Sequence, residues 1–307
     1  MKFLLLFLDG VGLGPDDPKI NPLARARMPH LETLLGGEKL VSHGQLETGR
    51  ATLKALDACL GVDGLPQSAT GQAALLTGQN VPAIVGYHHG PRPNSDIARF
   101  LKGGSLLTTL VNRGCRVAFV NAFPPQYFET TSSGPRARGT IAQAVLGAGI
   151  PLKTVDDLLN GEALSADFTG SAWRDRLGFT DIPLLEPHEA GERLATLAQR
   201  NDFTLFEFWL SDYIGHRRNM ETASTMLATV DQVLGGLLDA WDEDRGLILI
   251  TSDHGNLEDL STRRHTTNSV PGLIIGPPHY RYPFSASLRN LTHIAPAIAR
   301  LFEPGSG

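Results

Sequence analysis

Short runs of continuous apolar residues are the feature that most constrains the fold of this 307-residue chain. The runs do not alternate apolar with polar residues, so they predict strands that are covered on both faces. They span residues 3–8, 116–120, 203–210, 246–251 and 272–275. Helical periodicity lies between them, around residues 73–76, 106–112, 189–199, 220–241 and 291–301. Strands that alternate with helices predict an α/β fold, with a largely parallel sheet and helices on both of its faces.

The length suits a single domain, residues 1–307, with a well-buried core. The segment from about residue 79 to residue 199 differs from the rest, because it is rich in glycine and proline and carries short loops. We interpret part of this segment as a small cap or insertion over the sheet. The apolar run at 116–120 lies inside it and has the character of a core strand, so the limits of the cap stay open.

Composition excludes several classes of protein. The formal net charge is −5 and the basic residues are scattered, so no nucleic-acid partner is expected. No apolar segment approaches the length of a bilayer span, and the apolar run at 3–8 is better explained as a buried strand than as a signal peptide. Two cysteines, Cys59 and Cys115, are too few for a disulfide framework, which favours a cytoplasmic location. The oligomeric state is left open.

Three of the predicted strands run into an aspartate. The residues are Asp9, Asp212 and Asp253. A single aspartate in this position is usually a helix cap or a turn residue. In an open parallel sheet, however, ligands bind outside the carboxyl ends of the strands, so three such carboxylates from distant parts of the sequence can converge. The pattern predicts a site at that edge of the sheet.

Three histidines accompany the strand-end acids. His216 follows Asp212 by four residues, so both side chains can face one ion from a helix. His254 directly follows Asp253, and His265 lies in the polar loop after it. Each histidine alone is more simply a surface or core residue, but a mixed set of Asp and His suits Zn or Mn better than Ca. We therefore predict two divalent ions, the usual machinery of phosphate-ester chemistry.

The nucleophile is expected in the stretch GLPQSATGQ, residues 64–72. Ser68 follows a proline-containing turn and precedes a helical segment, where the helix N-terminus favours an anion. Its alternative role is a plain helix cap, and Thr70 is the rival hydroxyl.

At this point the motifs resemble those of a known family. GLPQSATGQ resembles the GLP…SEVGH segment of cofactor-independent phosphoglycerate mutase and the TTTGH segment of phosphopentomutase. FLDGVG, DYIGH, TSDHGN and HTTNSVP are similar to the mutases' LDGWG, DxxGH, TADHGN and HTTN-VP segments, in the same order. All of these enzymes belong to the alkaline phosphatase superfamily, so the resemblance implies an alkaline-phosphatase-like fold. The middle of the chain is not covered by these motifs.

The resemblance also implies a ligand set and a reaction. One ion would be held by Asp212, His216 and His265, and a second by Asp9, Asp253 and His254. Ser68 would bind at the metal pair and form a phosphoserine intermediate. The expected activity is thus a two-metal-dependent hydrolase of phosphoric monoesters that acts on a small phosphorylated substrate.

Several alternatives stay open. They are a small phosphomutase with the same phosphoserine, a sulfatase or phosphodiesterase, and a non-catalytic metal-binding protein. Gln72 stands where the mutases have histidine, and the roughly 140 residues between Ser68 and Asp212 are too few for the large inserted domain of phosphoglycerate mutase. That mutase activity is therefore not expected. For substrate binding we favour His88, His89 and Arg92, with other candidates at Lys54, Arg136 and Arg138.

Overall fold

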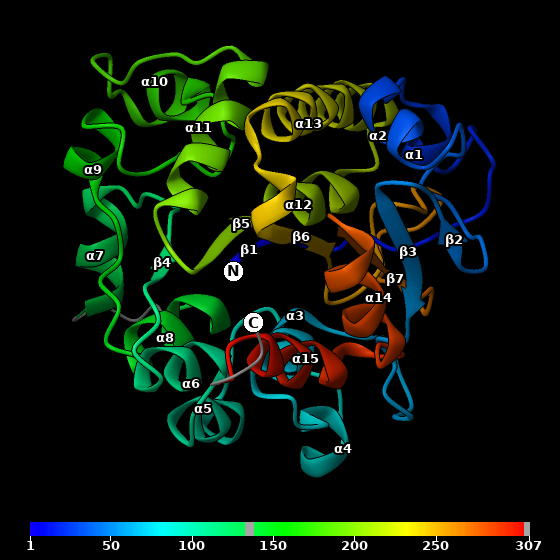
Figure 1. Ribbon diagram of the computed structural model, residues 1–307, viewed down its shortest axis with the longest axis horizontal. Coiled ribbons are helices and arrows are strands. Elements are labelled where there is room, and N and C mark those ends of the chain that lie inside the picture. The colour runs from blue at the N-terminus through cyan, green and yellow to red at the C-terminus, as the bar shows by residue number, and fades with distance from the viewer. Residues whose placement is uncertain (133–137, 304–307) are drawn as a thin grey trace.

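The computed structural model describes residues 1–132 and 138–303, and its centre is a seven-stranded sheet in the order β2-β3-β7-β6-β1-β5-β4 (Figure 1). The strands β6, β1, β5 and β4 pair in parallel, whereas β7 is antiparallel to β6 and to β3. Their bounds are β1 Lys2–Leu8, β2 Leu46–Glu47, β3 Ala51–Leu56, β4 Val117–Phe119, β5 Phe203–Phe208, β6 Gly246–Thr251 and β7 Val270–Ile275. The predicted α/β class is confirmed, although the sheet is mixed.

The antiparallel edge is the part of the sheet that the apolar pattern did not predict. The strands β2 and β3 pair antiparallel with each other. In β3, Lys54 is half-buried and Ala55 is exposed, so the strand does not present a continuous buried apolar run. β3 lies one strand in from the edge, between β2 and β7, and the short β2 pairs with only part of it.

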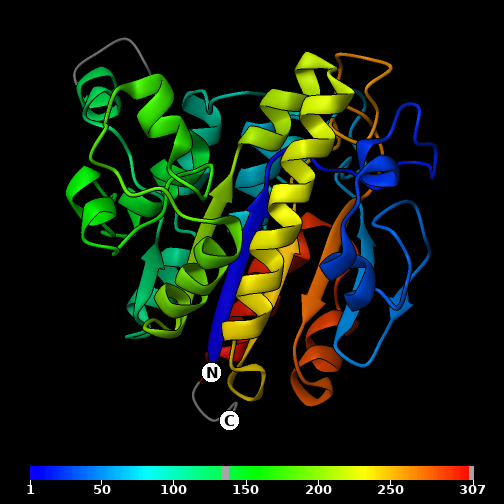
Figure 2. The same ribbon diagram turned by 90° about the horizontal axis from the view of Figure 1, so that it is seen from above.

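Two helical layers cover the sheet, one above it and one below it in Figure 1, and Figure 2 looks down onto the upper layer. Side chains of β1 alternate between them, because Leu4 and Leu6 join one core cluster and Phe3 and Leu5 join the other. The first layer consists of α1 Pro22–Arg25, α2 Pro29–Leu34, α11 Pro187–Gln199, α12 Leu210–Arg217 and α13 Met220–Ala240. The second consists of α3 Ser68–Thr77, α5 Ser95–Lys102, α6 Leu106–Asn112, α8 Thr140–Gly147, α14 Pro278–Ala286 and α15 Ile294–Leu301.

The helices α11 and α13 approach each other closely through glycine. A Cβ atom added at Gly236 would lie 1.9 Å from the carbonyl oxygen of His188, and one added at Gly191 would lie 2.0 Å from that of Val233. Only glycine permits this approach of the two backbones.

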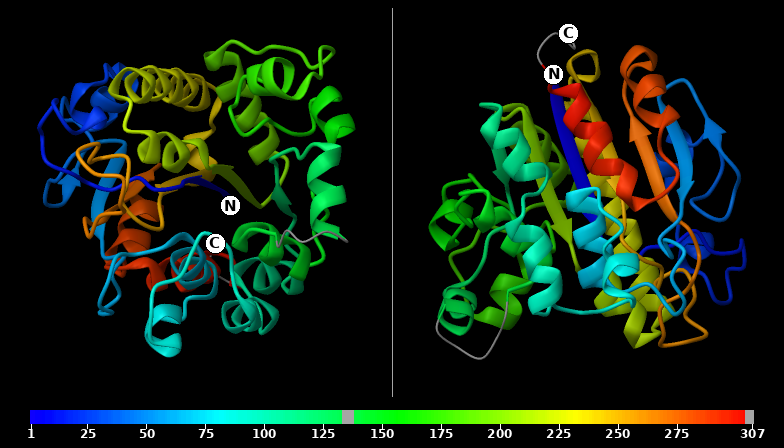
Figure 3. Two further views of the ribbon diagram at one scale, coloured as in Figure 1. Left: turned by 180° about the vertical axis from the view of Figure 1, so that it is seen from behind. Right: turned by 90° about the horizontal axis from the view of Figure 1, so that it is seen from below.

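The segment 79–199 divides between the sheet and a smaller cluster. It supplies β4 to the edge of the sheet, and α5, α6 and α8 pack with α3 in the second layer, which Figure 3 shows from below. A separate small core forms around Trp173, Leu158 and Ile182, beside α9 Val155–Leu159 and α10 Ser171–Leu177. The remaining helices of the segment are α4 Val81–Val85 and α7 Pro125–Ser132. The interpretation of part of this segment as a cap over the sheet stays a prediction.

Within residues 1–132 and 138–303, no helix combines the length and hydropathy that crossing a bilayer requires.

Candidate metal centre

The carboxyl ends of three neighbouring parallel strands build the centre. Asp9 follows β1, Asp253 follows β6, and Asp212 lies in the first turn of α12, directly after β5. Because β1 pairs with both β5 and β6, the three strands end at one edge of the sheet. His265 reaches the same place from the loop before β7.

The first group of candidate ligands consists of Asp212, His216 and His265. The Nε2 atom of His216 lies 3.4 Å from Oδ2 of Asp212 and 3.3 Å from Nε2 of His265. The Nε2 atom of His265 lies 3.7 Å from Oδ1 of Asp212. Two imidazole nitrogens and a carboxylate that face one another at these distances suit a cation between them.

The second group consists of Asp9, Asp212 and His254, so Asp212 belongs to both groups. The Nε2 atom of His254 lies 3.3 Å from Oδ1 of Asp9 and 3.7 Å from Oδ1 of Asp253. The other carboxylate oxygen of Asp253, Oδ2, is buried and has no hydrogen-bond partner. An orphaned buried carboxylate oxygen fits an ion that binds beside it. The assignment of Asp253 to the second ion stays a prediction.

The outer nitrogen of each histidine contacts a backbone carbonyl. A carbonyl that accepts from Nδ1–H fixes the ring orientation and leaves the Nε2 lone pair for a cation. The contacts join His216 to Arg263 O at 2.9 Å, His265 to Pro66 O at 2.7 Å, and His254 to Gly255 O at 3.3 Å. The residues present therefore fit a pair of divalent ions.

The charges of the centre shift the pKa values of its members. Burial opposes the charged form of His254, but Asp253 and Asp9 outweigh it and raise the pKa of His254 to about 10. Burial and the neighbouring Asp9 raise the pKa of Asp253 well above its usual value. Burial and the charge of His254 lower the pKa of His265 to about 4.

Ser68 is the first residue of α3, and its side chain points at this centre. Its Oγ atom lies 3.0 Å from Nε2 of His254. The hydroxyl of Thr70, the rival nucleophile, instead donates to the carbonyl oxygens of Gln67 and His89 at 3.2 and 3.3 Å. The structure therefore places Ser68 against the candidate ligands, whereas the hydroxyl of Thr70 is hydrogen-bonded to backbone carbonyl groups.

A glycine brings α3 against the loop after β6. A Cβ atom at Gly71 would lie 2.8 Å from the carbonyl oxygen of Asp253. Any larger residue would push the start of α3 away from the centre, so Gly71 helps to position Ser68.

Glu258 is a buried carboxylate that the strand-end pattern missed. Its Oε2 atom accepts from the backbone N–H of Gly12 at 2.9 Å and of Asn256 at 2.8 Å. Its Oε1 atom accepts from Nδ2 of Asn268 at 3.0 Å and from the hydroxyl of Thr266. These partners come from the three loops that carry Asp9, His254 and His265, so Glu258 ties the loops together. The sequence signal that could have identified Glu258 is its position in GNLED, shortly after the predicted ligand His254.

We expect Glu258→Gln to weaken metal binding by roughly 10- to 100-fold, because the new amide group would face N–H donors and loosen the loops. The measurement is the dissociation constant for Mn, together with the melting temperature of the metal-free protein. Asp259→Asn is the matched control, since within residues 1–132 and 138–303 the Asp259 carboxylate accepts hydrogen bonds from Ser261 of its own turn and from no other residue. A folded Glu258→Gln protein with parental affinity for Mn would show that the hydrogen bonds of Glu258 are not needed for metal binding.

Two other residues of the centre were also missed. The Nδ2 atom of Asn256 donates to Oδ1 of Asp212 at 2.6 Å and orients that carboxylate. Glu207 lies near the end of β5, where burial and the charge of Asp253 raise its pKa to about 8. Neither residue stands in a ligand-like spacing in the sequence.

The proposed substrate residues lie in a loop that is tied to α3. The backbone N–H of Thr70 donates to the carbonyl oxygen of His89 at 3.1 Å. The Nε2 atom of His88 lies 3.3 Å from the carbonyl oxygen of Val62, and burial lowers the pKa of His88. Among the described residues no hydrogen bond joins the side chains of His88, His89 or Arg92 to the candidate ligands, so their role stays a prediction.

The other basic candidates differ in their surroundings. Lys54 donates to Oε1 of Gln45 at 2.7 Å on the antiparallel edge of the sheet. Arg138 is part of the described structure and influences the pKa of Tyr127, whereas Arg136 lies outside the described residues.

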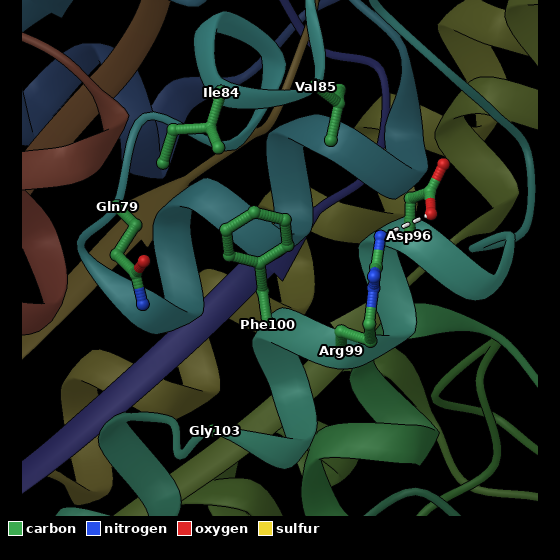
Figure 4. A pocket seen from close by; sticks show the side chains of 7 residues that line it. All are labelled: Gln79, Ile84, Val85, Asp96, Arg99, Phe100 and Gly103. Atoms are coloured by element: carbon green, nitrogen blue, oxygen red, sulfur yellow. Dashed lines mark hydrogen bonds and ion pairs between the residues drawn. The ribbon is translucent and has the colours of Figure 1, made fainter.

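A separate hollow of about 480 Å³ lies between α4 and α5 (Figure 4). It is lined by Ile84, Phe100 and an ion pair between Asp96 and Arg99. Because its charges are paired and it holds none of the candidate ligands, it adds nothing to the chemistry of the metal centre.

Comparison with known proteins agrees with this geometry. The family model described as Metalloenzyme superfamily matches residues 1–304. The chain is 25% identical over 198 residues to the 2,3-bisphosphoglycerate-independent phosphoglycerate mutase of Moorella thermoacetica, a match that covers 58% of this chain and 36% of that enzyme. The chain therefore corresponds to only part of the length of this relative.

Solved structures share the fold. The phosphoglycerate mutase of Leishmania mexicana has a TM-score of 0.59 at 12% identity, over 99% of this chain and 96% of that chain. The alkaline phosphatase of the Antarctic bacterium TAB5 has a TM-score of 0.55 at 13% identity, over 98% of this chain and 97% of that chain. At such identities the likeness shows the fold alone, and it confirms the fold that the motifs predicted.

Proposed function

This chain belongs to the metalloenzyme superfamily, and from that premise we propose that it hydrolyses phosphoric monoesters with two divalent ions and a phosphoserine at Ser68. It is an enzyme of the phosphatase or phosphomutase type. The observation that carries the proposal is the 3.0 Å approach of Ser68 Oγ to His254 Nε2, inside the group of candidate ligands. Mn and Zn are the ions that best suit a mixed set of Asp and His.

Two bound divalent ions would supply an activated serine hydroxyl and neutralise the charge on the phosphoryl oxygens. Asp212, His216 and His265 would hold one ion, and Asp9, Asp253 and His254 the other, with Asp212 near both. Asn256 keeps the Asp212 carboxylate in place through its hydrogen bond. Glu258 holds the loops of both groups in one arrangement.

The residues of the chain then support two steps. In the first, the bond between Ser68 Oγ and phosphorus forms while the ester P–O bond breaks and the alcohol leaves. In the second, water attacks phosphorus, inorganic phosphate leaves and Ser68 regains its hydroxyl. The start of α3 favours the anionic phosphoryl group, because backbone N–H groups and the helix dipole carry partial positive charge there.

A phosphomutase with the same phosphoserine is the second candidate, because relatives such as the Moorella thermoacetica enzyme are mutases. Such an enzyme would transfer the phosphoryl group to an alcohol rather than to water. The interval between Ser68 and Asp212 supplies β4, β5, helices of both layers and the small core around Trp173. This leaves few residues for a large inserted substrate domain. This favours the hydrolase.

The test uses metal-stripped protein with Mn or Zn restored and an aryl phosphate as substrate. We expect metal-dependent release of inorganic phosphate. Adding glycerol and measuring glycerol phosphate separates hydrolysis from transfer, because a mutase would transfer to the alcohol faster than to water. Stoichiometric metal binding without turnover of any phosphate ester would overturn the proposal and favour a non-catalytic metal-binding protein.

A further inference from the structure

The candidate metal centre is most open to solvent at His216. The side chain of His216 is 43% exposed, whereas those of Asp212 and His265 are 19% and 7% exposed. The side chains of Asp253 and His254 are fully buried. A substrate therefore reaches the candidate ligands from the side of His216.

The position of Ser68 favours the same side for the leaving group. Ser68 Oγ lies 3.0 Å from Nε2 of His254, which belongs to the second group of candidate ligands. In an in-line displacement the leaving oxygen departs opposite the attacking oxygen. The alcohol half of an ester would therefore point away from His254 and towards the first group, which includes His216.

Two exposed aromatic rings lie on α12 beside the ligands of the first group. Trp209 and Tyr213 are 45% and 40% exposed. Trp209 stands three residues before Asp212, and Tyr213 stands three residues before His216. Residues three apart on a helix are neighbours, with Cβ atoms about 5–6 Å apart. Each ring is thus next to one candidate ligand.

Contacts along the helix orient the two rings. The ring centroids of Trp209 and Tyr213 lie 6.3 Å apart, and the ring planes cross at 82°. The guanidinium group of Arg217 lies 4.6 Å from the centroid of the Tyr213 ring and donates a hydrogen bond to its hydroxyl group. A flat ring that stacks on one member of a perpendicular pair meets the edge of the other, and both arrangements are attractive. Because these contacts restrain the rings before a ligand arrives, binding costs less side-chain entropy.

Packing of the fold does not account for the two rings. Among the described residues, α12 contributes Leu210 and Ile214 to the core of the first layer, whereas Trp209 and Tyr213 take no part in it. The other two tryptophans of the chain are buried. Tryptophan and tyrosine are enriched in binding sites, because each offers a large apolar surface and few rotamers. The exposed pair therefore fits a role in binding.

We propose that Trp209 and Tyr213 form a subsite for a flat leaving group, with Arg217 as the residue that positions Tyr213. The substrate class is a phosphoric monoester whose alcohol carries an aromatic or heteroaromatic ring close to the ester oxygen. This inference rests on the proposed function for the position of the ester. It extends that function by assigning the alcohol half of the substrate.

The test measures binding to Zn-loaded protein by calorimetry, with phenylphosphonate as the probe that has a ring and methylphosphonate as the probe that has none. Both resist hydrolysis, because a P–C bond replaces the ester bond. We expect the parent to bind phenylphosphonate roughly 10-fold more tightly than methylphosphonate.

The double variant Trp209→Leu/Tyr213→Leu keeps apolar side chains but removes both flat rings. Its preference for phenylphosphonate should fall to about threefold or less, while its affinity for methylphosphonate stays within about twofold of the parent. The double variant Trp209→Phe/Tyr213→Phe should keep most of the preference, since phenylalanine still offers a ring. A role in folding alone would not produce this separation between the two probes.

Tyr282→Leu is the matched control. Tyr282 is also an exposed tyrosine with a neighbouring guanidinium group, that of Arg281, which lies 5.1 Å from its ring centroid. It belongs to α14, which follows β7 at the opposite end of the sheet from Asp253. This variant should bind both probes as the parent does. Metal content and melting temperature are measured for every variant.

Two results would overturn the subsite. One is equal affinity of the parent for the two probes, which would favour a protein partner as the ligand of the exposed pair. The other is a metal-loaded double Leu variant that retains the full preference for phenylphosphonate.

The subsite and the proposed function can fail separately, because the binding test needs no turnover. If the parent hydrolyses phosphate esters but shows no preference for phenylphosphonate, the subsite is wrong and the function stands. If the preference is present and is lost with the two rings but no phosphate ester is hydrolysed, the subsite stands and the hydrolase proposal fails.

Discussion

Ser68→Ala is expected to lower kcat for aryl phosphate hydrolysis by at least about a thousandfold, with two metal ions still bound. The hydroxyl is the only group of Ser68 that can bond to phosphorus, and its Oγ lies 3.0 Å from His254 Nε2. Alanine leaves the start of α3 unchanged in shape, so the loss would report chemistry rather than folding. The measurement is kcat in Mn, with mass spectrometry of acid-quenched parent protein to detect the phosphoserine.

Thr70→Val is the matched control for that experiment. The Thr70 hydroxyl donates to backbone carbonyls, so its loss should destabilise the protein by about 1 kcal/mol and change kcat little. A Ser68→Ala protein with parental turnover, or a phosphate found on Thr70, would remove Ser68 from the role of nucleophile.

Asp212→Asn is expected to have the largest effect on metal content. Asp212 belongs to both groups of candidate ligands, so its loss should weaken both ions by at least about 100-fold and leave less than one bound ion per chain. The metal-free protein should remain folded, because Asp212 contributes to the charge repulsion that raises the pKa of Asp9 and Asp253. The measurements are metal content after dialysis and the melting temperature with and without Mn.

Asp259→Asn again supplies the control, as an acid from the same loop region whose carboxylate, among the described residues, accepts hydrogen bonds from Ser261 alone. If Asp212→Asn kept two ions, or lost one and retained the other at parental affinity, Asp212 would not be shared. The resemblance to the superfamily would then describe the site better than the grouping of atoms in the structure.

The sequence was enough to predict that the site forms at the carboxyl ends of the central strands. Asp9, Asp212 and Asp253 each follow an apolar run, and parallel strands bring such ends together whatever lies between them. His216 was predicted by its four-residue spacing on a helix, and His254 by its adjacency to Asp253. These are local patterns, and local patterns can be read along one chain.

The rest depends on contacts between distant segments. Glu258 bonds to Gly12 across more than 200 residues, and no spacing in the sequence marks that pair. The grouping of Asp212 with Asp9 depends on the angle at which α12 leaves β5, which the residues of α12 alone do not determine. The antiparallel pairing of β3 with β7 involves β3, a strand beside the edge of the sheet whose apolar pattern is interrupted by Lys54.

The Glu258 tie also determines how the centre comes apart. A carboxylate shared by three loops makes their local opening cooperative, because releasing one loop leaves the partners of the others without an acceptor. The amides of Gly12 and Asn256 should therefore exchange with deuterium as a single unit, although their loops follow different strands. Loss of order at one end of the centre would then dismantle both ion positions in one step, so that the protein holds either the full set of ligand loops or none of it.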